Sequence, residues 1–181
     1  MSEQISERSS LWENFFRDRK KAEDDLEKLL LEVPIFSQLS QRELRQVCSI
    51  VHRRHYAPGE YIFTQGDPGL GMYVIERGKV EIIFQDDSGA EKKLALLADG
   101  DFFGDLSLLD ESPRSATAVA QIDSKIIGFF RPDLVALLSR SPKLGTKILF
   151  KLGEVIGTRL RVTNEQLAKS NAELEKIRNR G

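Results

Sequence analysis

The sequence predicts an α+β domain that is mainly β, an antiparallel sandwich or roll preceded and followed by helices. Between His52 and Phe130, short runs rich in β-branched and aromatic residues alternate with turns that contain glycine, and no helical periodicity interrupts them. Before and after this stretch, apolar residues recur every three or four positions, as in amphipathic helices. The 181 residues are enough for one such domain with a sizeable core and too few for two ordinary domains.

The first predicted element is an amphipathic helix over residues 11–33, within an N-terminal region of residues 1–33. Its apolar positions follow the helical period and are Trp12, Phe15, Ala22, Leu26 and Leu29. Pro34 ends the helix, because the residue before a proline is pushed out of the helical region. We expect this helix to pack on the β domain, and the alternative is that Trp12, Phe15 and Phe16 anchor it to a membrane or a partner. A short helix is predicted over Ser40–Val51, where Ser40 and Glu43 have the spacing of a capping box.

Six runs in the middle region, residues 34–140, predict strands. They are YIF (61–63), MYVI (72–75), KVEIIF (79–84), KKLALL (92–97), ATAVA (116–120) and KIIGFF (125–130). Turn signals such as QGDPGLG and DDSGA separate them. Short, regularly spaced strands without intervening helices favour an antiparallel arrangement.

The C-terminal region, residues 141–181, predicts a long helix. Pro132 suits the first turn of a preceding helix, and Pro142 interrupts the chain before the longer one. The long helix carries a heptad seam with two polar members: Ile156, Leu160, Thr163, Leu167, Ser170, Leu174 and Ile177. This seam predicts a homodimer. The alternative is that the stripe packs back onto its own β domain, and both arrangements can hold over different turns.

Composition excludes several kinds of protein. Lys and Arg number 27 against 28 Asp and Glu, for a formal charge of −1, so no global basic field draws the chain to nucleic acid or an anionic membrane. The single Cys48 excludes a disulfide framework and cysteine-ligated metal sites, and we expect it in the core. No signal peptide and no long apolar run is visible, which predicts a cytoplasmic protein without membrane insertion.

Two other patterns that could suggest a metal site or a catalytic site have little support in the sequence. His52 and His55 are three apart on a strand, so they point to opposite faces and cannot share a metal ion. Ser107 and Ser115 have no histidine nearby in the sequence, so there is no sign of a catalytic triad. We therefore expect no metal, no cofactor and no enzyme activity.

The segment FFGDLSLLDESPRSATAVA, residues 102–120, carries the chemistry of an anion site. Gly104 precedes a predicted helical turn whose free N–H groups can face an anion, and Arg114 can bind a phosphate with two parallel hydrogen bonds. Asp105 can accept a hydroxyl, and the small residues after Arg114 let a ligand approach the main chain. These groups fit a sugar phosphate. From the chemistry alone, an ion pair between Asp105 and Arg114 is the alternative.

This segment resembles the phosphate-binding cassette of the cyclic nucleotide-binding domain family. The matching residues are Phe103-Gly104-Asp105-Leu106-Ser107-Leu108 and Pro113-Arg114-Ser115-Ala116-Thr117. The segment VPIFSQLSQREL resembles the entry to such domains, and turn glycines agree, so the resemblance covers about residues 33–164. It implies an antiparallel double-stranded β-helix jelly-roll, the cyclic nucleotide-binding β-roll, flanked by N-terminal helices and a long C-terminal helix.

The resemblance also implies roles for particular residues. Arg114 would clamp the cyclic phosphate with the backbone after Gly104 and the hydroxyl of Ser115, and Asp105 would accept the ribose hydroxyl. Leu106 and Ser107 would contact sugar and phosphate through their backbone, and Thr117 would lie near the base. RLRVTNEQL, residues 159–167, is similar to the base-contacting segment of the bacterial catabolite activators, which places Thr163 and Asn164 at the adenine.

Two departures from the family pattern shape the functional prediction. Asp105 stands where the family has glutamate, and no helix-turn-helix follows the long helix, so we expect no sequence-specific DNA binding. The sequence predicts a sensor of cyclic nucleotide, cAMP rather than cGMP, that acts by population shift on a downstream partner protein. The alternative is a degenerate fold without ligand that serves as a dimeric interaction or scaffold protein.

Overall fold

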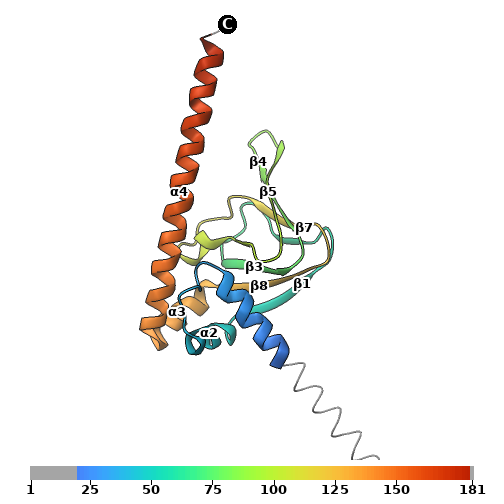
Figure 1. Ribbon diagram of the computed structural model, residues 1–181. Helices are drawn as coiled ribbons and strands as arrows, with labels where there is room; N and C mark the ends of the chain where they lie inside the picture. Colours follow the sequence, from blue (N-terminus) through green and yellow to red (C-terminus); the bar gives the residue numbers. More distant parts are fainter. Residues whose placement is uncertain (1–19, 180–181) are drawn as a thin grey trace, which may run out of the picture.

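The computed structural model describes residues 20–179, so the aromatic residues Trp12, Phe15 and Phe16 lie outside the described residues. The described part of the predicted N-terminal helix is helical over residues 20–32 and ends two residues before Pro34. Its Leu26 and Leu30 are buried in the core. Figure 1 shows this helix in blue beneath the β-roll and the long C-terminal helix at its side. The expected packing of the N-terminal helix on the β domain is thus present over these residues.

Eight antiparallel strands form the β-roll, which confirms the predicted fold. They are β1 (His52–Tyr56), β2 (Tyr61–Phe63), β3 (Gly71–Arg77), β4 (Val80–Gln85), β5 (Glu91–Leu97), β6 (Phe102–Phe103), β7 (Thr117–Ala120) and β8 (Ser124–Phe130). One sheet has the order β1-β8-β3-β6 and the other β2-β7-β4-β5. Neither β1 nor β6 was among the six predicted runs, and β1 was expected only as the strand that carries His52 and His55. The sequence of β1, HRRHY, is polar and largely exposed, and β6 has only two residues.

Strand β3 is buried on both faces because it separates two hydrophobic clusters. Met72 and Val74 face the cluster formed with the helices, whereas Tyr73 and Ile75 face the cluster between the two sheets. This alternation follows from the two-residue period of a strand. The helices therefore cover one face of the β1-β8-β3-β6 sheet, and the interior of the roll lies on its other face.

Three further helices complete the fold: α2 (Gln41–Cys48), α3 (Arg131–Arg140) and α4 (Pro142–Arg178). Ser40 caps α2 in the predicted capping box with Glu43, and α3 and α4 each have a proline in the first turn, as expected. Ile148 and Leu152 of α4 are fully buried, but no residue after Leu152 in the described part of α4 is buried. Helix α4 therefore packs on the domain through its first turns, and Ile156 is the one seam residue in the described part of α4 that is partly buried.

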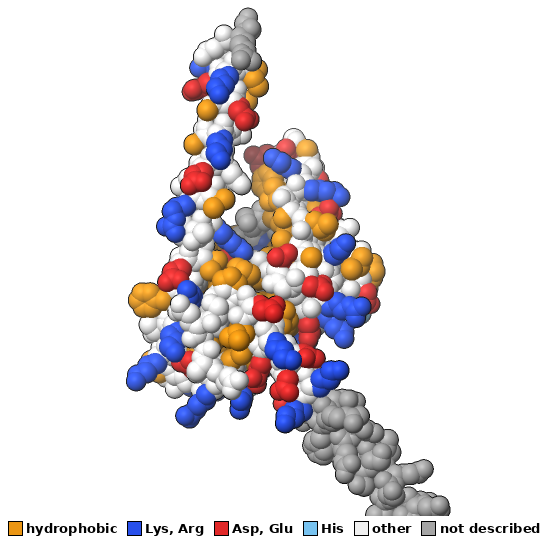
Figure 2. Space-filling view, in the orientation of Figure 1, with side chains coloured by type: hydrophobic (Ala, Val, Ile, Leu, Met, Phe, Trp, Pro, Cys, Tyr) orange, Lys and Arg blue, Asp and Glu red, His pale blue; other side chains and the backbone are white. Residues whose placement is uncertain are grey.

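The rest of α4 projects beyond the roll (Figure 1). Its seam residues Leu160, Leu167, Leu174 and Ile177 are between 58% and 70% exposed. Figure 2 shows apolar side chains spaced along the projecting helix between charged ones. Packing back over these turns, the alternative to dimerisation, is absent from the described residues.

Cys48 and the two histidines have ordinary structural surroundings. Cys48 is half-buried against the helical core, and burial raises the pKa of its thiol to about 11, so the thiol stays protonated at neutral pH. His52 contacts Asp133, and His55 contacts Asp123. Within residues 20–179, no group of three or more His, Cys, Asp or Glu could hold a metal ion, and no helix has the length and apolar character to cross a membrane.

An ion pair between Glu43 and Lys147 joins α2 to α4 and makes stability depend on pH. The Lys147 ammonium, 2.8 Å from the Glu43 carboxylate, and the Ser40 cap lower the pKa of Glu43 from 4.5 to about 2. Because the folded pKa lies below the unfolded one, this stabilisation is present above pH 4.5 and is lost as the pH falls towards 2. We expect Glu43→Gln to lower the free energy of unfolding by about 1 kcal/mol at pH 7 after solvent screening. Urea unfolding at pH 7 and pH 3 would measure this, and an equal difference at both pH values would contradict it.

Candidate nucleotide-binding site

Arg114 is the central side chain of the site. It is only 6% exposed, and its guanidinium lies over the ring of Phe63, 4.1 Å from the centroid. It donates hydrogen bonds to the hydroxyl of Ser107 (2.8 Å) and to the backbone carbonyls of Gly71 (2.8 Å) and Gly104 (3.3 Å). All three acceptors are neutral, and no carboxylate of residues 20–179 forms an ion pair with it. Burial accordingly lowers its pKa from the usual value, although arginine remains charged at neutral pH.

The backbone around Arg114 is fixed by the β2–β3 loop. The N–H of Arg114 donates to the carbonyl of Asp67, and the N–H of Gly66 donates to the carbonyl of Arg114, both at 2.8 Å. An isolated bridge pairs Pro68 with Pro113 directly beside them. These bonds hold the arginine in place independently of the bonds of its side chain.

Gly104 is required at the start of the cassette for two reasons. Its φ is +72°, in the left-handed region, and a Cβ at this position would lie 2.7 Å from Nη1 of Arg114. After Gly104, residues Asp105–Leu108 form η1, a 3-10 turn. The predicted helical turn is therefore present, with the tighter 3-10 geometry.

Asp105 and Arg114 do not pair with one another, so that alternative is wrong. Oδ1 of Asp105 instead accepts a hydrogen bond at 2.7 Å from Nη1 of Arg159 on α4. Asp105 is 4% exposed, and its second oxygen, Oδ2, is buried without a hydrogen-bond partner, as is Nε of Arg114. Buried polar atoms are normally paired, so the cassette holds one acceptor and one donor for which a ligand can supply partners.

The cassette encloses a cavity of about 250 Å³. Its lining residues come from the cassette and the inner face of the roll: Phe63, Ile82, Phe103, Gly104, Leu106, Ser107, Asp110, Ser112, Pro113, Arg114, Ser115 and Ala116. Five of the nine predicted site residues are in this lining, namely Gly104, Leu106, Ser107, Arg114 and Ser115. Apolar rings and small side chains surround one cation, which suits a ligand with a flat apolar part and an anionic group.

The other four predicted residues lie elsewhere. Asp105 is at the α4 side of η1, and the hydroxyl of Thr117 accepts a hydrogen bond from the N–H of Gln65. Thr163 and Asn164 are exposed on the projecting part of α4, and the Thr163 hydroxyl donates to the carbonyl of Arg159 in its own helix. In this conformation neither residue of α4 contacts the cavity.

Sequence reasoning missed Arg159, which joins α4 to the cassette. Its guanidinium also donates to the carbonyl of Phe102 and lies 4.5 Å from the centre of the Phe102 ring. Only its spacing offered a signal, because Arg159 lies one helical turn before Thr163 on the face that carries the predicted base contacts. The aromatic support of Arg114 by Phe63 and Tyr73 was likewise not predicted.

A β-roll with a short cassette that buries an arginine defines a class of small-ligand receptor domain. The chain matches the family model for the cyclic nucleotide-binding domain over residues 53–141. It is 38% identical over 147 residues to the cyclic AMP receptor protein of Thermus thermophilus, covering 81% of this chain and 65% of that protein. It is 33% identical over 124 residues to the cAMP-dependent protein kinase regulatory subunit of Pyricularia oryzae, covering 68% of this chain and 30% of the subunit.

A solved structure agrees. The N-terminal domain of a transcriptional regulator from Streptomyces coelicolor matches with a TM-score of 0.66 and 31% identity, over 76% of this chain and 95% of that one. The chain belongs to the cyclic nucleotide-binding domain family. It spans less than two thirds of the length of both named relatives, the receptor and the kinase subunit.

Proposed function

We propose that this protein is a cyclic nucleotide sensor, without enzyme activity of its own, that binds cAMP in preference to cGMP. The observation that carries the proposal is the buried Arg114, whose hydrogen bonds go only to neutral acceptors and whose Nε has no partner. A cyclic phosphate would supply the missing negative charge and a bidentate acceptor. The named relatives, a cyclic AMP receptor protein and a cAMP-dependent kinase regulatory subunit, support cAMP as the ligand.

Asp105 is proposed to receive the ribose hydroxyl on its free Oδ2 while Oδ1 keeps its bond to Arg159. The carboxylate would then join the ligand to α4. A ligand that binds better to one position of α4 shifts the population towards that position. We propose that the shift brings Thr163 and Asn164 to the base, because both are exposed and lie about one helical turn after Arg159 on α4.

The output is proposed to pass through α4 to a partner protein in the cytoplasm, and the sensor to act as a homodimer. Exposed seam residues of α4 at heptad spacing offer an apolar stripe to a second copy. Neither DNA nor a membrane is part of this proposal.

Thermal unfolding of the whole chain with cAMP and with cGMP tests the function. A ligand at about one hundred times its dissociation constant stabilises the folded state by roughly 2.7 kcal/mol, which raises the Tm by several degrees. We expect such a rise with cAMP and a smaller one with cGMP at equal concentration. A Tm unchanged by either nucleotide would favour the ligand-free scaffold instead.

The shortened carboxylate gives a second prediction. Asp105→Glu should bind cAMP equally well or up to about tenfold more tightly, because the longer side chain reaches further towards the ligand hydroxyl. Asp105→Asn is the matched control, since it keeps the size but removes the charge that pairs with Arg159, and we expect weaker binding. Calorimetry measures both variants. A glutamate variant that binds worse than the asparagine variant would contradict the proposed contact.

A further inference from the structure

A second feature lies on the β1-β8-β3-β6 sheet, at the end of β3. Arg77 of β3 is directly opposite Lys125 of β8, and Lys125 is directly opposite His55 of β1. Lys125 and His55 are paired in regular register and so point to the same face, and Arg77 is paired with Lys125 just after a shift in the register of β3. These three residues lie in one row across the sheet. We call Arg77, Lys125 and His55 the basic row. Two like charges directly opposite one another destabilise a sheet.

Each acidic side chain near the row has a partner, which for Asp123 is His55 of the row itself, with one exception. Glu76 pairs with Arg53, Asp123 pairs with His55, and Asp99 accepts a hydrogen bond from the N–H of Gly78 at 2.7 Å. The exception is Asp25, which lies on the N-terminal helix. Among residues 20–179, neither Arg77 nor Lys125 forms an ion pair, so both head groups are available to the carboxylates of a ligand.

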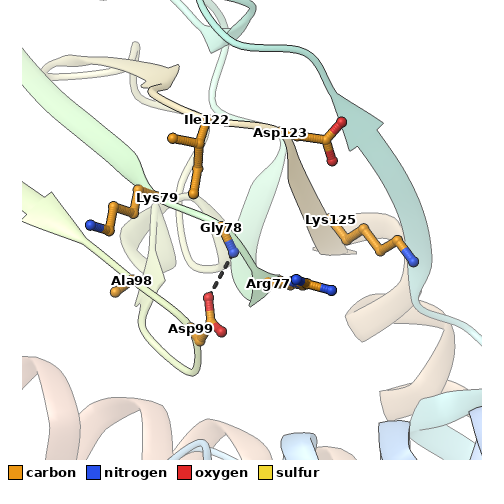
Figure 3. A pocket seen from close by; sticks show the side chains of 8 residues that line it. All are labelled: Arg77, Gly78, Lys79, Ala98, Asp99, Ile122, Asp123 and Lys125. Carbon is orange, nitrogen blue, oxygen red and sulfur yellow. Dashed lines mark hydrogen bonds between the residues drawn. The ribbon is translucent and has the colours of Figure 1, made fainter.

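The turn that presents Arg77 is closely packed against Ser124. Gly78 has a φ of +132°, and a Cβ there would lie 2.1 Å from Oγ of Ser124. The Ser124 hydroxyl accepts a hydrogen bond from the N–H of Lys79 and donates one to the carbonyl of Ile122. Figure 3 shows Arg77 and Lys125 with their head groups on the same side of this turn, and Lys79 on the other.

Two cavities meet at the row. One, of about 770 Å³, is lined by Arg77, Ala98, Ile122 and Lys125 among others, and the second, of about 490 Å³, is lined by His55, Lys125 and Ala22 among others. They share Lys125, and we call the two together the trough; Ala98 and Ile122 line one part of it and Ala22 the other. None of its lining residues lines the cassette cavity. Arg114 binds the carbonyl of Gly71 at the start of β3, and Arg77 ends that strand, about 20 Å away at the usual rise per residue.

We propose that this trough binds an acidic segment of a partner protein in extended conformation. Strands are about 4.8 Å apart, so the row from His55 to Arg77 spans about 10 Å, the length of three extended residues. Alternate side chains of an extended segment face the same way, so two acidic residues can meet Arg77 and Lys125 while the others contact Ile122 or Ala22. A single small anion would use the two cations but leave these apolar side chains uncovered.

The test measures fluorescence anisotropy of a labelled peptide of alternating glutamate and valine with the full chain. The double variant R77Q/K125Q should bind this peptide about tenfold more weakly than the unaltered chain. R42Q/K92Q is the matched control, because it removes one arginine and one lysine that are exposed elsewhere, and its binding should not change. The same peptide with glutamine in place of glutamate should not bind, and the affinity for the acidic peptide should fall with added salt.

Thermal unfolding provides a readout that needs no peptide. Removing two like charges that face one another should raise the Tm of R77Q/K125Q by about 1–3 °C relative to R42Q/K92Q. Stabilisation by cAMP should be equal in both variants, which separates this proposal from the nucleotide site. Equal peptide binding by the two variants, no binding at all, inorganic phosphate that binds as tightly as the peptide, or a lowered Tm in R77Q/K125Q would each overturn the proposal.

Discussion

Replacing Arg114 by alanine is expected to abolish measurable binding of cAMP, with a loss of affinity of at least about a hundredfold. Among residues 20–179, the guanidinium is the only cation in the lining of the cassette cavity. A bidentate pair with phosphate comprises two charge-assisted hydrogen bonds of about 1.5–3 kcal/mol each. Isothermal calorimetry with cAMP measures the loss directly. An unchanged dissociation constant in the alanine variant would refute the assignment of this segment as the phosphate-binding cassette.

Arg114 also supports the cassette through Ser107 and the carbonyl of Gly71, so a control for folding is needed. Arg114→Lys keeps the charge but lacks the planar fork, and we expect it to bind cAMP at least about tenfold more weakly than the unaltered chain. The surface variant Arg42→Ala should bind normally. If Arg114→Lys keeps the Tm of the unaltered chain but binds weakly, the loss belongs to the ligand contact and not to unfolding.

The fold could be predicted because most of its signals are local. Proline at the ends of helices, the pair of Ser40 and Glu43, and glycine between apolar runs each act within a few residues, and each has the expected role in the structure. Strand β1 is absent from the six predicted runs for a physical reason, although His52 and His55 were placed on a strand. Its polar side chains pair with groups that are distant in the sequence, such as Arg53 with Glu76 and His55 with Asp123, and no local pattern reports such pairs.

The site was only partly accessible to prediction. Gly104, Ser107 and Arg114 lie within eleven residues, so one short sequence motif was enough to predict their part of the cavity lining. The partner of Asp105 could not be deduced, because Arg159 is 54 residues away and reaches the cassette only through the packing of α4 on the roll. The sequence suggested Arg114 as the partner of Asp105. The Arg114 guanidinium instead donates to the neutral backbone carbonyls of Gly71 and Gly104.

The bond between Asp105 and Arg159 offers a physical reason for an aspartate at position 105, where the family has the longer glutamate. A buried carboxylate needs a partner, and Arg159 supplies one from a helix that otherwise contacts the roll mainly through its first turns. One oxygen of Asp105 is thereby committed to α4 and the other is free for a ligand. Nucleotide binding and the position of α4 would then share one side chain, so a ligand that binds Asp105 would act on the helix that carries the predicted dimer seam.

Replacing Leu167 by glutamate is expected to convert a dimer of this protein into monomers. Leu167 lies in the middle of the exposed seam between Leu160 and Leu174, and in a parallel coiled coil it would face its own copy across the two-fold axis. Two glutamates there would bring like charges together in an apolar interface, which costs several kcal/mol. The seam already contains Thr163 and Ser170, which weaken apolar packing, so it has little stability to lose.

Size-exclusion chromatography with light scattering at micromolar concentration measures the change. The unaltered chain should have twice the mass of one chain, and the Leu167→Glu variant the mass of one. Ala172→Glu is the matched control, because it adds the same charge on the outer face of α4, where the new carboxylate would lie four residues before Lys176 and support the helix. The control should remain dimeric. A monomeric unaltered chain, or the same oligomeric state in both variants, would exclude the seam as the dimer interface. The exposed leucines of α4 would then be expected to contact a different protein.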